Sequence, residues 1–132
     1  IRMQAGVLAH RPYLWIPANK TILGNVAVSA GHHVWMADTQ SQQSIDAWLK
    51  QLNEMKALEP AMVIPGHMEA GSALDASAID FTFNYITAFV KAKQHSHNSQ
   101  ELIAKMVTLY PEFTDTSNLE LGAKVHMGEM IW

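Results

Sequence analysis

The sequence contains no cysteine, no excess of basic residues and no long apolar run. Without cysteine the chain forms neither disulfides nor thiolate metal sites, and its redox compartment stays undecided. The net charge is −3 and the lysines and arginines are scattered, which argues against a nucleic-acid partner. No apolar segment approaches the roughly 20 residues that span a bilayer, so we expect no membrane partner.

The composition that is present predicts a folded domain. The chain has 132 residues, of which 48% are hydrophobic and 16% charged, and this balance favours a packed core over disorder. The length suits one domain, residues 1–132. The first residue is Ile1 rather than methionine. We therefore expect a processed product, an engineered piece or a fragment of a longer protein.

The N-terminal third predicts a β-hairpin. Residues 13–16 are aromatic and branched, which is typical of a strand. Residues 17–20, Pro-Ala-Asn-Lys, have the composition of a turn. Residues 21–28 then read as a second strand. The two strands are expected to pair across this short turn.

A helix is predicted from near Gln40 to Pro60. Asp38 or Thr39 is expected to cap it, since a short side-chain oxygen there accepts an orphan backbone N–H; this role explains Asp38 more simply than a catalytic base. Proline ends the helix. Its apolar residues recur every three or four positions and form one stripe: Ile45, Trp48, Leu49, Leu52, Met55 and Leu58.

Residues 61–64, Ala-Met-Val-Ile, form a short continuous apolar run, which predicts a strand covered on both faces. A strand, a helix and a strand in this order indicate an α/β fold. The remainder predicts helices. One spans residues 74–93, a second is capped by Ser99 and ended by Pro111, and the last runs from residue 116 or 117 to 124 or beyond.

A histidine follows this apolar strand in the segment MVIPGHMEAG, residues 62–71. His67 is expected beyond the end of the strand, two residues after Pro65, where Gly66 permits a sharp turn and Pro65 stiffens the approach. Ligands of α/β folds bind at the carboxyl ends of strands. A rigid neutral imidazole there is a good metal ligand. A histidine that caps the next helix or packs in a loop is the simpler alternative.

Three segments occur in a fixed order: LWIPANKTILGN, HHVWMADTQSQQSIDAWLKQLNEMKALEP and MVIPGH. From about Tyr13 to His67 they resemble the C-terminal half of a metallo-β-lactamase-superfamily hydrolase. The nearest likeness is to a bacterial branch with a WIP strand, an HVWxADT loop and a VxPGH strand end. The tail, YPEF followed by LELGAKVHMGEMIW, is similar to the C-terminus of the same branch.

The resemblance implies a four-layer αββα sandwich with a metal site at one edge of its two sheets. Most ligands of that family come from an N-terminal HxHxDH loop, which this chain lacks. The HSH of residues 95–97 is not followed by Asp-His and reads as a solvated helix end. We therefore expect the C-terminal half of the sandwich: a β-hairpin, a helix, a strand and C-terminal helices.

The resemblance also implies two metal ligands. His67 matches the last histidine ligand of the family. Asn25 follows Gly24 where the family has Gly-Asp, and a neutral amide cannot bridge two cations as a carboxylate does. His10 is the nearest match to a histidine ligand before the first strand, three residues late. The parent protein is then expected to hold zinc or another divalent metal, as one ion rather than two, and this chain alone one ion or none.

Two functions remain open. In the first, the chain belongs to a metal-dependent hydrolase of a small-molecule substrate, and His67 serves a site completed by an N-terminal half. In the second, it is a degenerate, non-catalytic binding or interaction domain. A stand-alone α/β interaction domain is a third, weaker reading. The missing half or a second copy of the chain is the expected partner, covering a sheet face formed by Tyr13, Trp15, Ile22 and Val26.

Other aromatic and histidine residues receive structural interpretations. His32 and His33 lie in the loop before the first helix. One of them can face the cleft and touch substrate, but two partly exposed loop residues are the favoured interpretation. Trp15, Trp35 and Trp48 are expected to anchor the core.

Overall fold

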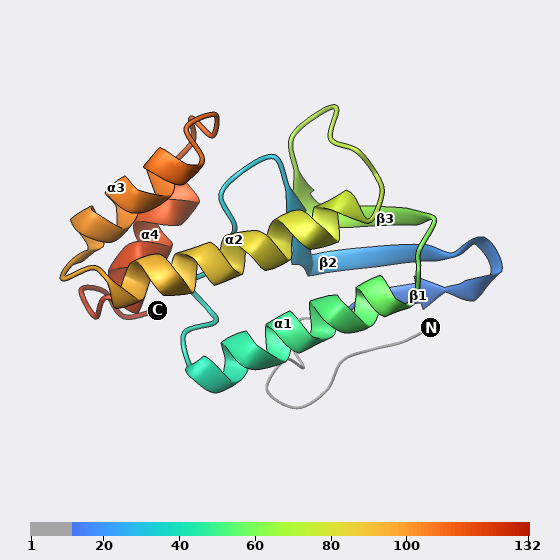
Figure 1. Ribbon diagram of the computed structural model, residues 1–132, viewed down its shortest axis with the longest axis horizontal. Helices are drawn as coiled ribbons and strands as arrows, with labels where there is room; N and C mark the ends of the chain where they lie inside the picture. Colours follow the sequence, from blue (N-terminus) through green and yellow to red (C-terminus); the bar gives the residue numbers. More distant parts are fainter. Residues whose placement is uncertain (1–11) are drawn as a thin grey trace.

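The structure, a computed structural model, describes residues 12–132 (Figure 1). This part of the chain contains a three-stranded sheet of order β1-β2-β3. Strands β1 (Leu14–Ile16) and β2 (Thr21–Ala30) form the predicted antiparallel hairpin, joined by a short 3-10 turn. Strand β3 (Met62–Met68) pairs with β2 in the parallel direction. The hairpin and the parallel neighbour give a mixed sheet.

Four helices complete the described part of the chain. They are α1 (Gln42–Ala57), α2 (Ser77–Gln94), α3 (Ser99–Leu109) and α4 (Ser117–His126). The predicted α/β class and the predicted order of elements are therefore confirmed. No helix between residues 12 and 132 is both long and apolar enough to cross a bilayer.

The predicted helix caps were wrong at two helices. The Ser41 side chain caps α1 by accepting the backbone N–H three residues later at 3.1 Å, whereas Asp38 and Thr39 lie in the turn before it. At α3 the cap is Asn98 rather than Ser99. In both cases the cap has extended backbone angles and its side-chain oxygen faces the orphan N–H groups, which is the geometry that capping requires.

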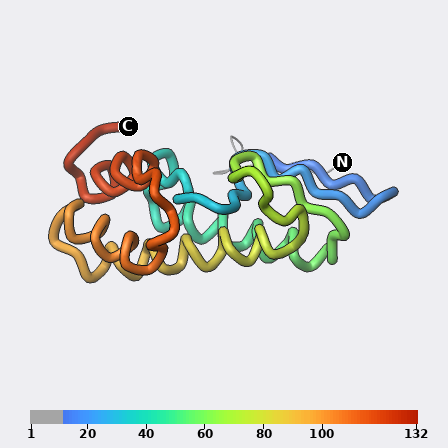
Figure 2. The backbone as a smooth tube through the Cα atoms, turned by 90° about the horizontal axis from the view of Figure 1, so that it is seen from above, coloured from blue at the N-terminus to red at the C-terminus, as the bar shows by residue number. Residues whose placement is uncertain are grey.

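Helices α1 and α2 lie on the same face of the sheet (Figure 2). Ile22 and Val63 are paired on adjacent strands, and both are completely buried. Trp48 of α1 is also completely buried, and its indole N–H donates to the Ala27 carbonyl at 2.9 Å. Trp48 is thus the core anchor that the sequence predicts, and Trp15 is only partly buried against the same core.

The sheet face that bears Tyr13 and Ile22 was predicted to be uncovered, and this prediction was wrong because the helices cover it. Tyr13 and Ile22 are completely buried, and the Tyr13 hydroxyl donates to Glu54 of α1 at 2.7 Å. The alternation of strand side chains groups Trp15 with its partner Ile22 on one face, but it does not show which face the helices cover. The residues that point away from the helices are instead half-buried and lie in one row across the sheet: Leu14, Leu23 and Ile64.

Strands β2 and β3 approach unusually closely at Gly66. β2 carries extra residues here, because Asn25 is opposite Pro65 and Ser29 is opposite His67. Asn25 has a φ of 51°, a left-handed conformation that asparagine tolerates better than most residues. A Cβ atom at Gly66 would lie 2.1 Å from the Asn25 carbonyl oxygen. Only glycine therefore permits this bulged pairing.

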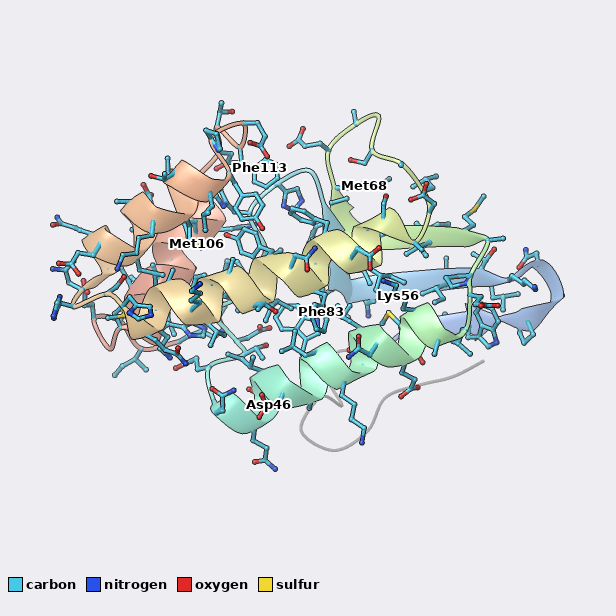
Figure 3. The ribbon with its side chains drawn as sticks, viewed as in Figure 1. Asp46, Lys56, Met68, Phe83, Met106 and Phe113 are labelled. Atoms are coloured by element: carbon cyan, nitrogen blue, oxygen red, sulfur yellow. The ribbon has the colours of Figure 1, made fainter. Side chains whose placement is uncertain are left out.

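The first half of α2, the end of α3 and the loop to α4 share an aromatic cluster. Tyr85 lies 5.0 Å from Tyr110, and Phe81 lies 5.7 Å from Phe113, between ring centres. Tyr110 and Phe113 stack with an interplanar angle of 5°. Figure 3 shows Phe113 in the loop between α3 and α4. The cluster ties the C-terminal helices to α2.

His126 at the end of α4 connects three segments. Its Nε2 lies 2.8 Å from the Met36 carbonyl oxygen, and its Nδ1 lies 3.4 Å from Lys93 Nζ of α2. The carbonyl accepts and the ammonium donates, so the ring is the neutral tautomer with its proton on Nε2. Burial lowers the pKa of His126, and the positive charge of Lys93 lowers it further.

We predict that this lowered pKa makes the protein less stable in mild acid. Below the unfolded-state value of 6.5 the unfolded chain takes up the proton first. The free energy of unfolding is therefore constant above that pH and falls below it, at no more than about 1.4 kcal/mol per pH unit for one histidine. Urea unfolding from pH 8 to 5 measures the slope, which His126→Gln is expected to reduce.

His95→Gln is the matched control, because the His95 side chain is exposed and removing it should leave the slope unchanged. An equal reduction by both substitutions would contradict the role given to His126.

The close approach at Gly66 makes a second prediction. Gly66→Ala is expected to lower the free energy of unfolding by about 1–3 kcal/mol, because backbone atoms must move to admit the methyl group. Gly71→Ala is the comparison, since a Cβ there meets nothing within 4 Å and only its φ of +84° opposes the change. Urea unfolding should show a larger loss for Gly66→Ala; equal losses would exclude the steric explanation.

Candidate functional site

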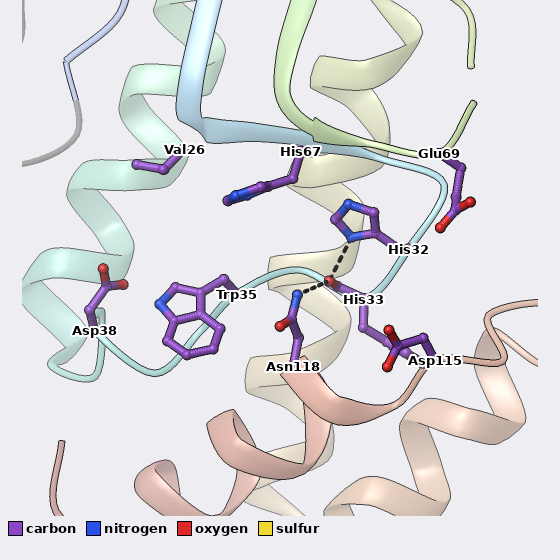
Figure 4. Close-up of a pocket in the computed structure, with 9 residues that line it drawn as sticks. All are labelled: Val26, His32, His33, Trp35, Asp38, His67, Glu69, Asp115 and Asn118. Carbon is purple, nitrogen blue, oxygen red and sulfur yellow. Dashed lines mark hydrogen bonds between the residues drawn. The ribbon is translucent and has the colours of Figure 1, made fainter. Parts of the chain in front are cut away.

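A pocket of about 470 Å³ lies at the carboxyl ends of β2 and β3 (Figure 4). The sheet forms one side of the pocket. The loop after β2 and the start of α4 form the other sides. This is the edge at which α/β sheets place their ligands. Its lining combines imidazole, indole, amide and carboxylate groups: Val26, His32, His33, Trp35, Asp38, His67, Glu69, Asp115 and Asn118.

His67 lies in this pocket but inside β3, not in a loop beyond it. The predicted strand end was wrong because the bulged pairing continues through Ser29 with His67 and Ala30 with Met68. Pairing with β2 fixes the backbone of His67, and so fixes the point from which the imidazole extends. In Figure 4 its ring extends across the pocket toward the side of Val26.

His32 is the second imidazole of the pocket. Its ring centre lies 6.1 Å from that of His67, with 56° between the ring planes. Its Nδ1 lies 2.9 Å from the His33 carbonyl oxygen, so Nδ1 carries the proton and donates it. The lone pair of the neutral ring is then on Nε2. This backbone bond to one nitrogen is the arrangement that commonly orients a metal-binding histidine.

The spacing of the two rings is wider than a shared ion requires. With zinc–nitrogen bonds of about 2 Å and tetrahedral geometry, two ring centres lie roughly 5 Å apart. A side-chain rotation of His67 or His32 would close the difference. Residues 12–132 contain no group of three or more His, Asp or Glu side chains that could hold a metal ion. The described residues thus offer an incomplete ligand set.

Asn25 does not share the pocket with His67. Its side chain is exposed and lines a separate cavity of about 340 Å³, together with Pro12, Leu14 and Leu23. The two predicted ligands are thus on neighbouring strands but face different cavities. The left-handed backbone at position 25 explains the asparagine on structural grounds, because asparagine tolerates that conformation better than most residues. His10, the other candidate ligand, lies outside the described residues.

His33 is completely buried, contrary to the prediction of a partly exposed loop residue. Its Nδ1 lies 2.8 Å from the Tyr85 hydroxyl, and its ring meets the edge of Phe113 at 5.3 Å. Burial lowers the pKa of His33, and the adjacent His32 lowers it further. A neutral His33 therefore fixes the loop to α2, while His32 faces the pocket.

Trp35 and Asp38 also have positions that the sequence did not predict. Trp35 is half-buried at the pocket, and its ring lies edge-on to Trp132 at 5.0 Å, so it is not a core anchor. Asp38 lines the pocket instead of capping α1, and it accepts the Thr39 hydroxyl at 3.2 Å.

Three pocket residues were missed by sequence reasoning. Glu69 follows β3, Asp115 lies in the loop just before α4, and Asn118 is in the first turn of α4. The Asn118 amide N–H donates to the His33 carbonyl at 3.4 Å, which holds α4 against the histidine loop. The Asp-x-Ser turn, in which Asp115 accepts from Ser117, is readable in the sequence, but nothing local shows that it meets residues 80 positions earlier.

No protein-family model matches this sequence, and a search of curated proteins finds no match. The metallo-β-lactamase resemblance therefore rests on the segments quoted above.

Proposed function

We propose that the chain is the C-terminal part of a metal-dependent hydrolase of the metallo-β-lactamase superfamily. In this proposal His67 and His32 contribute imidazole ligands to a zinc ion or another divalent metal. The observation that carries the proposal is the pair of imidazoles at the carboxyl edge of the sheet, one of them oriented by a backbone carbonyl. The ordered sequence segments support the same interpretation.

The remaining ligands are proposed to come from another polypeptide segment. Catalytic zinc generally has three protein ligands and one open position. His67 and His32 supply two at most, so the resemblance assigns the others to an N-terminal half with an HxHxDH loop. A bound zinc ion would supply a water of lowered pKa as the nucleophile. Asp38 lines the same pocket and provides a carboxylate that can accept a proton.

A non-catalytic binding domain is the second candidate. Asn25, where the family has a bridging aspartate, has a left-handed backbone and lines a different cavity. A chain that lacks the bridging carboxylate cannot hold a two-metal centre, but it still has the pocket. In that case the imidazole and indole side chains bind a ligand and no turnover follows.

The metal proposal predicts that zinc contacts His67 and His32 in the purified chain. Zinc titration followed by NMR of the histidine ring carbons should shift the signals of both residues. His67→Ala and His32→Ala should each weaken binding by tenfold or more, because a two-ligand site loses half its donors. The chain alone should not hydrolyse β-lactams, thioesters or phosphodiesters.

The segment His95-Ser-His97 is the internal competitor for zinc, since two exposed imidazoles stand two residues apart. His97→Ala should leave the response of His67 unchanged. A response confined to His95 and His97 would remove the metal proposal. Zinc-dependent turnover by this chain, lost in His67→Ala, would show that no second half is needed.

The proposed half-sandwich also needs a cover for the outer row of the sheet, Leu14, Leu23 and Ile64. Among the described residues both long helices lie on the opposite face. Large apolar patches on monomers usually mark interaction sites. In the intact protein the N-terminal half is the proposed partner. In a solution of this chain alone, a second copy related by a two-fold axis takes its place.

We therefore predict a dimer at low micromolar concentration by sedimentation equilibrium. Leu23→Glu should shift it to monomer, because a carboxylate would be buried at the interface. Asn53→Glu on the exposed side of α1 is the control and should remain dimeric. A well-folded 14.7 kDa monomer of the unaltered chain would overturn the prediction.

A further inference from the structure

A groove of about 660 Å³ lies between α2 and α3, away from the histidine pocket. Its residues from α2, together with the C-cap of that helix, are spaced by three, one and three positions, which places them on one face of the helix. Three alanines keep the groove open, and its rim carries longer polar side chains. The lining residues are Ala88, Lys91, Ala92, His95, Ala104, Lys105, Thr108 and Leu109.

The charge of the groove differs in sign from that of the protein. The chain has a net charge of −3, yet the groove lining contains two lysines and a histidine and no carboxylate. Lys105 donates to the His95 carbonyl and to the Ser96 hydroxyl, and these bonds hold its ammonium group at the His95 end of the groove. Lys91 is exposed and forms no salt bridge within residues 12–132.

The nearest carboxylate along α3 is directed elsewhere. Glu101, one turn before Lys105, accepts from the backbone N–H and the ring of His97. Lys91 is therefore available to a negative group from outside, whereas Lys105 already uses two of its three donors. The alanine surface beside Lys91 suits an alkyl chain.

From this geometry we infer that the groove binds a medium-chain alkyl carboxylate. From Ala88 to His95 the helix rises about 10 Å, at 1.5 Å per residue. That length matches an extended chain of roughly eight carbons. The alkyl part lies along Ala88, Ala92 and Ala104, and the carboxylate pairs with Lys91.

A small ligand fits the groove better than a folded protein partner. Its volume is in the range of small-molecule pockets, which is about 300–1,000 Å³. A stable protein interface buries on the order of 800 Å² on each partner, and two turns of two helices provide much less. An acidic peptide helix is the competing occupant, and the experiment below separates the two.

The test is a titration of the whole 132-residue chain with octanoate, kept below its micellar concentration, followed by NMR of the alanine methyl groups. The methyl signals of Ala88, Ala92 and Ala104 should shift and saturate. Hexanoate should bind about tenfold more weakly, since two methylene groups are lost. Lys91→Gln should weaken octanoate binding about three- to fivefold, the value of one exposed ion pair.

Lys50→Gln on the exposed side of α1 is the matched control and should not change the affinity for octanoate. Ala104→Phe fills the groove from an exposed position and should abolish the shifts of the other two methyl groups. Equal affinity of octanoate for the unaltered chain, Lys91→Gln and Ala104→Phe would overturn the inference. So would an absence of methyl shifts with octanoate, including the case in which an acidic helical peptide binds instead.

Discussion

The close contact between the Gly66 backbone and the Asn25 carbonyl is the constraint on which the candidate site depends. Because β2 contains extra residues at this point, a side chain at position 66 would prevent the two strands from meeting. With glycine there, pairing resumes at Ser29 and His67 and continues to the end of both strands. The bulge thus sets the position of His67, and bulges next to functional sites commonly re-aim a side chain in this way.

The second determinant of the site is the buried pair of His33 and Tyr85. One imidazole is used to fasten the loop to α2, so that its neighbour His32 is presented to the pocket. The His33 carbonyl then accepts from both His32 and Asn118, which joins the loop to α4. Two adjacent histidines therefore have different roles, one in packing and one at the surface of the pocket.

Local patterns predicted the elements well. The apolar spacing around Trp48 gave α1, and the aromatic and branched run around Trp15 gave the first strand of the hairpin. Single short side chains were less reliable guides to helix starts, because Ser41 and Asp38 are equally good caps in isolation. The choice between them is made by the path of the loop, which depends on distant contacts such as His126 with Met36.

The site was predicted only in part. Proline, glycine and histidine at the end of an apolar strand predicted a ligand site at His67, and His67 does line a pocket. The position of Asn25 depends on a register shift that period-two reasoning cannot detect. The alternation also does not tell which face of the sheet the helices cover. Asp115 and Asn118 reach the pocket through helix packing, for which no nearby residue provides a signal.

The parallel pairing of β2 with β3 has a consequence for the order of assembly. Thr21 and Met62 are roughly 40 residues apart in the chain, and such contacts form slowly because a long loop must close first. The hairpin and α1 are local structures and need no such closure. We expect His67 to reach His32 only after this closure, so that the pocket forms late in folding.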